Sequence, residues 1–294
     1  MNCPACGTPN VAEAILCAAC GVQQGRSVWD DDTRCVVYIS FDIDGPSGMM
    51  NKNPEVEQKM STMSMGEYGP RTGAPRILDL FAKYGVQTSF YIPGWVAERH
   101  PKLLERIVAE GHEVGHHGYK HEPPATLSRE EEAAVLDHGI EIISGILGSP
   151  PVGYRSPSWE LTEHSLRLMA ERGIVYDSSL MADDVPYFVG EPDQRLVELP
   201  IHWSMDDYPH FGFFPGDPNR LMASPDHVFN VFASAFEDQY ERGGLFALTL
   251  HPYISGRPGR LTVVERLIKH IQGFPGVRFM RGIDIATEFQ ARFG

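Results

Sequence analysis

Apolar and polar residues follow one another along the chain in blocks that predict alternating strands and helices. An apolar, β-branched run begins at residue 35 and is stopped by the turn pair Gly45-Pro46, which indicates a buried strand. Further strands are expected at residues 86–92, 112–117, 152–155, 174–176, 245–250 and 277–280, and helices at residues 75–84, 95–110, 128–147, 162–171, 225–242, 261–272 and 283–293. Repeated βα units imply a parallel sheet, and about this many units can close into a barrel.

Two stretches lack such a pattern. Residues 46–73 are rich in Met and Gly, and residues 181–224 contain polar clusters without clear periodicity. Long unpatterned connections are usually functional or mobile. We therefore expect loops in both places, and we expect these loops to determine the choice of substrate.

Composition narrows the range of partners. The net charge is −14, from 39 acidic and 25 basic residues, and Lys and Arg form no block. This argues against nucleic acid or an anionic membrane as the main partner. No apolar run is long enough to span a bilayer, and the N-terminus lacks the pattern of a secretory signal. We expect a cytoplasmic protein that forms a homo-oligomer.

Four of the five cysteines form two CxxC pairs near the N-terminus, and each pair is followed by glycine. The pairs are Cys3 with Cys6 and Cys17 with Cys20. Four thiolates suit tetrahedral zinc, and a segment this short would need the metal in order to fold. A redox dithiol or disulfide pair is the alternative. We expect a zinc ribbon at residues 1–25, a polar linker at residues 26–34 and a catalytic domain at residues 35–294, with the ribbon offering a docking site for a protein partner.

Carboxylates and imidazoles gather where the early strands are expected to end. Asp42 and Asp44 close the first strand and point to the same side if the extended backbone continues to Gly45. His117 and His121 follow the third strand, and on a helical turn this spacing would place both on one face. Two imidazoles and one carboxylate leave positions open on a metal, as in a catalytic site. Solvated turn aspartates and a His-rich loop are the structural alternative.

Later strands are expected to end in further polar groups. Arg155 follows the fourth strand, where a guanidinium can hold a carboxylate in its ionised form. His251 ends an apolar strand and could act as a general acid, because histidine titrates near neutrality. The candidate pocket residues are Tyr154, Trp159, Asp177, His202 and Trp203.

These groups occur within five short motifs: SFDIDG at residues 40–45, HGYKH at 117–121, YRSPSW at 154–159, YDSSL at 176–180 and LHP at 250–252. In this order they resemble the five motifs of the polysaccharide deacetylase superfamily, over essentially all of residues 35–294. The resemblance is strongest to the bacterial branch that holds peptidoglycan-deacetylase-like, allantoinase-like and cyclic-imide-hydrolase-like proteins. It implies a distorted (β/α)7 barrel with its site at the carboxyl ends of the strands.

The resemblance also implies a role for individual residues. Asp42 matches the general base, and Asp44, His117 and His121 match the ligands of a divalent metal, expected to be zinc. Arg155 matches the residue that orients the base, His251 the general acid, and Ser158 the donor of a backbone N–H to the oxyanion. Two departures stand out: Ile43 separates the two aspartates, and Gly118 replaces the usual Ser or Thr.

The expected activity is metal-dependent hydrolysis of non-peptide carbon–nitrogen bonds, either N-deacetylation or the opening of a small linear or cyclic amide. The substrate would be an N-acetylated sugar or a small amide or imide. One alternative is a metal-independent hydrolase similar to allantoinases and imidases. Another is an inactive barrel that binds a partner through the zinc ribbon, although the intact set of site residues argues against it.

Overall fold

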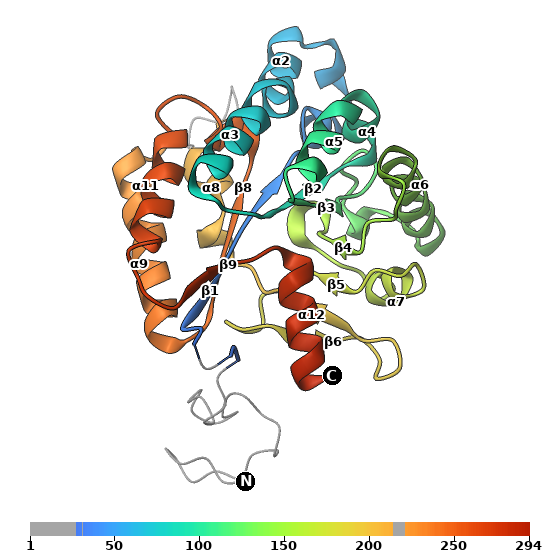
Figure 1. Cartoon of the computed structure of the whole chain (residues 1–294). Helices are drawn as coiled ribbons and strands as arrows, with labels where there is room; N and C mark the ends of the chain where they lie inside the picture. The colour runs from blue at the N-terminus through green and yellow to red at the C-terminus, as the bar shows by residue number, and fades with distance from the viewer. Residues whose placement is uncertain (1–27, 31, 214–220) are drawn as a thin grey trace.

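A computed structural model of the chain (Figure 1) describes residues 28–30, 32–213 and 221–294. The predicted zinc ribbon and its four cysteines lie outside the described residues, as do residues 26, 27 and 31 of the predicted linker. Within the described ranges, no helix combines the length and the apolar character that crossing a membrane requires.

One sheet organises the described residues. Its strands are β1 (Cys35–Asp42), β2 (Ser89–Ile92), β3 (Glu113–His116), β4 (Gly153–Tyr154), β5 (Tyr176–Asp177), β6 (Tyr187–Val189), β7 (Leu196–Glu198), β8 (Leu245–Leu250) and β9 (Val277–Phe279). They lie in the order β6-β7-β5-β4-β3-β2-β1-β8, and β9 also pairs with β1. All pairs are parallel except β6 with β7. The predicted α/β class is confirmed, and the sheet curls into a half-barrel with β6 and β8 at its edges.

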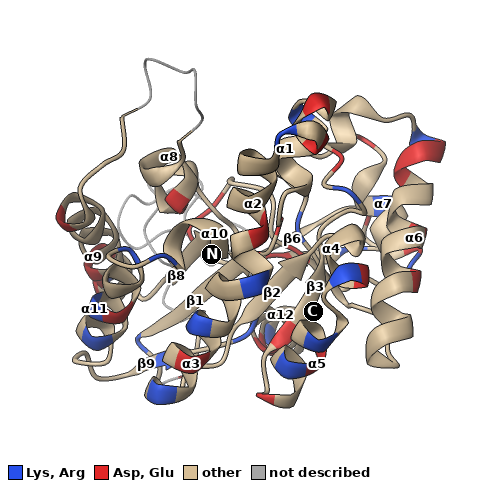
Figure 2. Cartoon of the chain, turned by 90° about the horizontal axis from the view of Figure 1, so that it is seen from above, with Lys and Arg blue, Asp and Glu red and all other residues tan. Residues whose placement is uncertain are grey.

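Helices pack around this sheet (Figure 1). They are α1 (Ser47–Lys52), α2 (Met60–Tyr68), α3 (Ala74–Tyr84), α4 (Gly94–Arg99), α5 (Pro101–Ala109), α6 (Arg129–Leu147), α7 (Ser165–Ala170), α8 (Asp207–Phe211), α9 (Pro225–Arg242), α10 (Pro252–Ser255), α11 (Leu261–Ile271) and α12 (Gly282–Phe293). Local chemistry sets several boundaries. A capping box between Ser128 and Glu131 starts α6, and Gly148 ends it in the left-handed conformation. Both basic and acidic residues are found on the helices around the sheet (Figure 2).

Strand β1 is buried along its whole length, and its two faces have different neighbours. Val37, Ile39 and Phe41 pack into the core beneath the outer helices. Val36 and Tyr38 belong to a second cluster inside the curled sheet. Because strand side chains alternate in direction, Ser40 and Asp42 continue the inner row. The strand pattern therefore carries the Asp42 carboxylate to the inside of the half-barrel, at its upper end.

The segment at residues 46–73 is helical, so the loop expected there is wrong. It contains α1, α2, a short 3-10 helix (Pro54–Gln58) and a π-helical turn (Gly69–Gly73). Glycines stand where the backbones meet: a Cβ on Gly66 would lie 2.5 Å from Pro46 Cα, and one on Gly73 would lie 2.1 Å from Pro252 O. Glycine thus takes the contact positions that apolar side chains occupy in an ordinary amphipathic helix, which hides the helical pattern.

Two other expectations are corrected. The helix expected over residues 95–110 is two helices, α4 and α5, because Pro101 begins a new helix after His100. Within residues 181–224, where we expected a loop, the structure contains β6, β7 and α8. These elements are only three to five residues long, too short for a period to be recognised.

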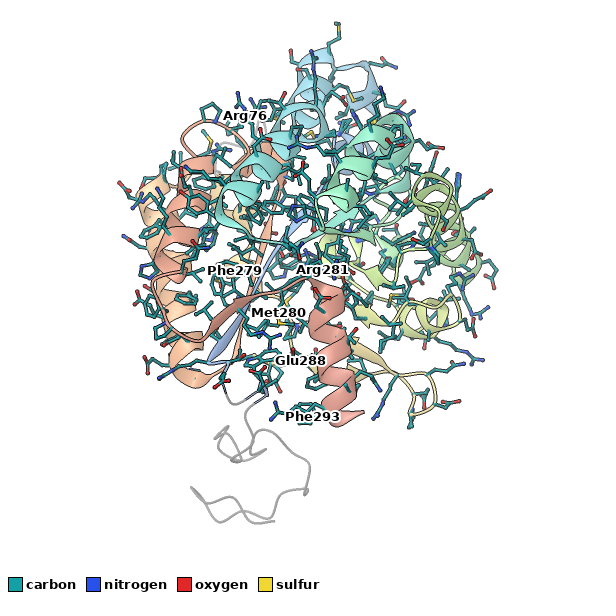
Figure 3. The ribbon with its side chains drawn as sticks, in the orientation of Figure 1. Arg76, Phe279, Met280, Arg281, Glu288 and Phe293 are labelled. Carbon is teal, nitrogen blue, oxygen red and sulfur yellow. The ribbon has the colours of Figure 1, made fainter. Side chains whose placement is uncertain are left out.

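The last helix closes the lower end of the half-barrel. Figure 3 shows Phe279, Met280 and Arg281 on the segment that leads into α12, with Glu288 and Phe293 further along that helix. At the start of α12, the Gly282 N–H donates to Ser89 Oγ over 2.8 Å and the Ile283 N–H donates to a Glu113 oxygen over 3.0 Å. The buried lower interior is thereby tied to the C-terminal helix.

Candidate active site

Strand β1 brings two carboxylates to the upper end of the sheet. Asp42 is its last residue, and Asp44 follows just before the turn at Gly45. His117 Nε2 lies 3.4 Å from Asp44 Oδ1 and 3.9 Å from Asp42 Oδ2. All three side chains are buried. The two aspartates therefore face the same imidazole, as the alternation along the strand predicts.

His117 and His121 meet through a tight loop, so the expected helical turn is wrong. The backbone turns through positive φ angles at Gly118 (+73°) and at His121 (+61°). His121 Nε2 then lies 3.6 Å from Asp44 Oδ2. The Nδ1–H of His117 donates to Arg155 O, since a carbonyl only accepts, over 2.7 Å. This contact fixes the ring and leaves the Nε2 atom of a neutral His117 as the donor atom toward a cation.

The cluster of Asp44, His117 and His121 fits a divalent cation. One ligand atom from each residue lies within 4.8 Å of the others, and Asp44 Oδ1 is buried without a hydrogen-bond partner in the described structure. Burial raises the pKa of Asp44, but the facing histidines outweigh it and the net pKa lies below the usual range. Burial lowers the pKa of His121 to about 4, which keeps its ring neutral. Burial lowers the pKa of His117, but the carboxylates of Asp42 and Asp44 outweigh it and raise the pKa, so that a cation would take the place of a proton on this ring. Two imidazoles, neutral when they bind a metal, and a carboxylate suit zinc and leave positions open for water and substrate.

Arg155 holds Asp42 from below. Its NH1 donates to Asp42 Oδ1 over 2.9 Å and to Ser40 Oγ over 2.8 Å. On its other side, NH2 donates to Ser178 Oγ over 2.8 Å and Nε donates to Ser178 O over 3.0 Å. The guanidinium carbon lies 4.3 Å from the centre of the Tyr91 ring, and the side chain is fully buried. These contacts bind one oxygen of Asp42 and leave Oδ2 directed at the cluster of metal-binding residues.

His251 is oriented by a buried aspartate. Its Nδ1–H donates to Asp207 Oδ1 over 2.7 Å, and its Nε2 lies 3.8 Å from Asp44 Oδ2. Asp207 also accepts from the His251 backbone N–H and from the Ser255 hydroxyl. Burial lowers the pKa of His251, but the carboxylates of Asp206 and Asp207 outweigh it and raise the pKa well above the ordinary value. At neutral pH His251 therefore presents a protonated Nε2 to the site.

These groups share one cavity of about 250 Å³. Its lining residues are Asp42, Asp44, Gly45, Gly48, Met49, Lys52, His117, His121, Ser158, Trp159, Trp203, Asp206, Tyr208, His251 and Tyr253. Ser158 and Trp159 both have positive φ angles, +62° and +58°. Trp159 stacks on Trp203 with ring centres 4.3 Å apart. The strained turn at Ser158 is thus held in place beside an aromatic wall.

Three residues expected in the pocket do not line it. Tyr154 is buried in β4 and stacks on His116. Asp177 is buried in β5 and accepts from the Ser179 hydroxyl over 2.8 Å. His202 is exposed and lines a separate cavity beside β8. Asp177 instead supports the site from a distance, because Ser179 Oγ in turn accepts the backbone N–H of Ser156, the residue after Arg155.

The sequence analysis did not assign a role to Asp207, Ser178 or Ser40. Asp207 is noticed in the sequence only as part of a polar cluster, and its partner His251 lies 44 residues further along. Ser178 lies within one of the motifs, yet only the structure shows that it holds Arg155. The signal for Ser40 is its position two residues before Asp42, on the same side of the strand.

Comparison with known proteins agrees with this geometry. A family model described as polysaccharide deacetylase matches residues 31–176. A peptidoglycan deacetylase of Helicobacter pylori is 32% identical, over 87% of this chain and 97% of the relative. A solved structure from Mycobacterium smegmatis, assigned as a polysaccharide deacetylase, has a TM-score of 0.87 at 36% identity and covers 90% of this chain and 93% of its own. An allantoinase structure has a TM-score of 0.80 at 23% identity, covering 96% of this chain and 98% of its own, which shows a shared fold.

The fold and the site together define a hydrolase of the deacetylase type, which acts on carbon–nitrogen bonds other than peptide bonds. The chain belongs to the polysaccharide deacetylase family.

Proposed function

We propose that this protein is a metal-dependent N-deacetylase that removes the acetyl group from an N-acetylated amino sugar. The observation that carries the proposal is the convergence of Asp44, His117 and His121 beside the free oxygen of Asp42 and the protonated nitrogen of His251. Amide hydrolysis needs a base for water, an electrophile for the carbonyl and an acid for the leaving nitrogen, and these groups can supply all three. The name of the Helicobacter pylori relative supports a peptidoglycan glycan as substrate.

Each residue has a defined part in this proposal. When bound by Asp44, His117 and His121, a divalent cation such as zinc acts as a Lewis acid on the amide carbonyl and makes water a stronger acid. Asp42 Oδ2 accepts a proton from the attacking water, while Arg155 holds Asp42 Oδ1. His251 Nε2 donates its proton to the leaving nitrogen. The backbone N–H of Ser158 stabilises the oxyanion.

The metal-independent alternative, similar to allantoinases, is less well supported. A mechanism without metal leaves no use for the convergence of Asp44, His117 and His121, whose ligand atoms lie within 4.8 Å of one another. The likeness to an allantoinase concerns the fold. An inactive barrel is also less well supported, because the sequence keeps the full set of side chains expected in the site.

The direct test is acetate release from chitin-type oligomers and from peptidoglycan glycan, measured for the wild type and for Asp42→Asn, each with zinc and after chelation. We expect release by the zinc-loaded wild type, loss in Asp42→Asn and recovery of the chelated wild type when metal is restored. Ser61→Ala, an exposed change on α2, serves as the control variant. Release that persists in chelated wild type would contradict metal dependence, and the absence of release from every N-acetyl substrate would contradict deacetylation.

We also propose that Cys3, Cys6, Cys17 and Cys20 bind a structural zinc ion that forms a docking module. The support is their spacing in the sequence. Elemental analysis should find about two metal ions per chain in the wild type and about one in Cys17→Ser/Cys20→Ser. Equal metal content in both proteins would contradict the ribbon.

The cytoplasmic location and the homo-oligomer stay predictions, which cell fractionation and light scattering would test.

A further inference from the structure

The active-site cavity is lined by several carboxylates and by a single lysine. Asp42, Asp44 and Asp206 contribute carboxylates, and Lys52 is the only Lys or Arg among the described lining residues. The proposed deacetylation gives Lys52 no part in binding the cation, activating water or protonating nitrogen. Its side chain forms no ion pair with a carboxylate of the described residues. A lysine in this position offers an unused positive charge to whatever enters the cavity.

The position of Lys52 is set by the metal-binding loop. Lys52 ends helix α1, whose residues Met49 and Met50 are buried. Between them and Lys52, the Asn51 side chain donates to the backbone oxygen of His121 over 2.5 Å. Gly48 lies so close that a Cβ there would be 3.4 Å from His121 Cε1. Helix α1 therefore lies directly against the His121 loop, which keeps the stem of Lys52 at the edge of the site.

The Lys52 side chain extends toward the opposite wall of the cavity. Its Nζ lies 4.9 Å from the centre of the Tyr208 ring, in a cation–π contact. Tyr208 belongs to α8 and directly follows Asp207, the partner of His251. The ammonium group thus lies between the loop of the metal-binding residues and the segment that orients the general acid. A lysine ammonium on a flexible stem can turn toward an anion in that space without disturbing either wall.

We propose that Lys52 makes the site selective for substrates that carry a carboxylate close to the amide to be cleaved. This inference rests on the proposed deacetylation and names the class of substrate. A neutral N-acetylglucosamine unit gives the ammonium no anionic partner, whereas N-acetylmuramic acid carries a carboxylate on the same sugar as its acetamide. A small acyclic amido acid or ureido acid has the same pair of groups. The shared chemistry is an anionic group beside the scissile carbon–nitrogen bond.

The test compares the binding of two methyl glycosides. One is the methyl glycoside of N-acetylmuramic acid, which has a free carboxylate, and the other is the methyl glycoside of N-acetylglucosamine, which has none. Calorimetry is done on the zinc-loaded full chain carrying Asp42→Asn, which removes the base so that neither ligand is turned over. We expect the acid to bind roughly tenfold more tightly than the neutral sugar. Adding Lys52→Met should abolish this ratio by weakening only the acid, and Lys52→Arg should keep most of it. Raised salt should also reduce the ratio.

Lys59→Met is the matched control, because Lys59 is exposed, pairs with Glu55 and does not line the cavity. It should leave the ratio unchanged. Equal binding of both ligands to the parent protein, or an equal loss for both ligands in Lys52→Met, would overturn the inference. A small ureido acid forms a third arm: preference for it over the sugar acid would identify a small molecule as the source of the carboxylate. Turnover is measured separately, so a lack of acetate release with retained acid preference would contradict deacetylation and leave the role of Lys52 standing.

Discussion

Two clusters of buried polar side chains occupy the inside of the half-barrel, and they are built on opposite principles. In the lower cluster, the hydroxyls of Tyr38, Tyr91 and Tyr176 bond in a chain that ends on Glu113, which also accepts from Ser89. No side-chain oxygen of these five residues lacks a hydrogen-bond partner. The upper cluster is the group of site residues Asp42, Asp44, His117, His121 and His251. In it, Asp44 Oδ1 has no hydrogen-bond partner among the described residues. The groups of the lower cluster satisfy one another, whereas the groups of the upper cluster converge on a cavity with a carboxylate oxygen left for a ligand.

Arg155 joins the two clusters. Its guanidinium lies over the Tyr91 ring of the lower cluster and donates to Asp42 of the upper one. The satisfied cluster can thereby act as the rigid base on which the reactive one is positioned. Changes in the upper cluster should therefore affect rate more than stability, and changes in the lower cluster should do the reverse.

The largest expected effect on rate comes from Asp42→Asn. An amide of nearly the same shape cannot accept a proton from water, so kcat/KM should fall by roughly 10³-fold or more. The melting temperature should also fall, because the Asn oxygen can still accept from Arg155 but no longer compensates the charge of the buried guanidinium. Acetate release and thermal unfolding check both parts, and a rate within tenfold of the wild type would contradict the role of Asp42 as base.

Arg155→Lys should have the next largest effect. Lysine keeps the charge but cannot hold Asp42, Ser40 and Ser178 at the same time, so Asp42 loses its orientation. We expect kcat to fall by roughly 10²-fold with a smaller change in KM, because the substrate does not contact Arg155. A change confined to KM in steady-state kinetics would show that Arg155 acts in binding instead.

Asp207→Asn should change the pH dependence of the reaction. The carboxylates of Asp206 and Asp207 raise the pKa of His251, so the acid form that donates the proton persists above neutral pH and is lost as pH rises through the raised value. Removing one carboxylate lowers that pKa, and the alkaline limb of the kcat/KM profile should move to lower pH. The contribution of the Asp207–His251 pair to stability should have the same sign. It is fully present below a pH of about 6.5, the pKa of histidine in the unfolded chain, and it is lost as pH rises through the raised pKa of His251 in the folded protein. An unmoved alkaline limb would show that His251 is not the acid.

Glu113→Gln should have the smallest effect on rate and a clear effect on stability. Glu113 Oε2 accepts from both Ser89 and the Ile283 N–H, and an amide nitrogen placed there would meet two donors. We expect the free energy of unfolding to fall by about 1–3 kcal/mol, with kcat/KM within a few-fold of the wild type. Denaturant unfolding measures the first quantity. If Glu113→Gln were stable but inactive, the separation between the two clusters would fail.

The sequence predicts the upper cluster better than the fold that surrounds it. Asp42, Arg155 and His251 end recognisable strands, so alternation and strand order place them at one edge of the sheet. The loop at residues 117–121 is predicted wrongly as a helical turn, because the positive φ at His121 has no signal in a residue other than glycine. Helix α2 is missed because Gly66 occupies its buried contact position.

Other features depend on contacts that no local pattern records. Asp207 meets His251 only when α8 is folded against β8. An isolated parallel β-bridge between Asp206 and Thr249 also joins the two segments. The Lys52 side chain reaches Tyr208 from a helix that the sequence does not reveal. Long-range partners of this kind follow from tertiary packing, which periodicity along one segment cannot report.

Metal binding by the upper cluster, measured together with activity, tests the central claim most directly. Chelated protein carrying Cys17→Ser/Cys20→Ser, which removes the proposed ribbon ligands, is titrated with zinc while bound metal and acetate release are followed. The account predicts that activity returns in proportion to one bound ion per chain and that the further change Asp44→Ala abolishes both. Full activity without bound metal, or one tightly bound ion retained in Asp44→Ala, would contradict it.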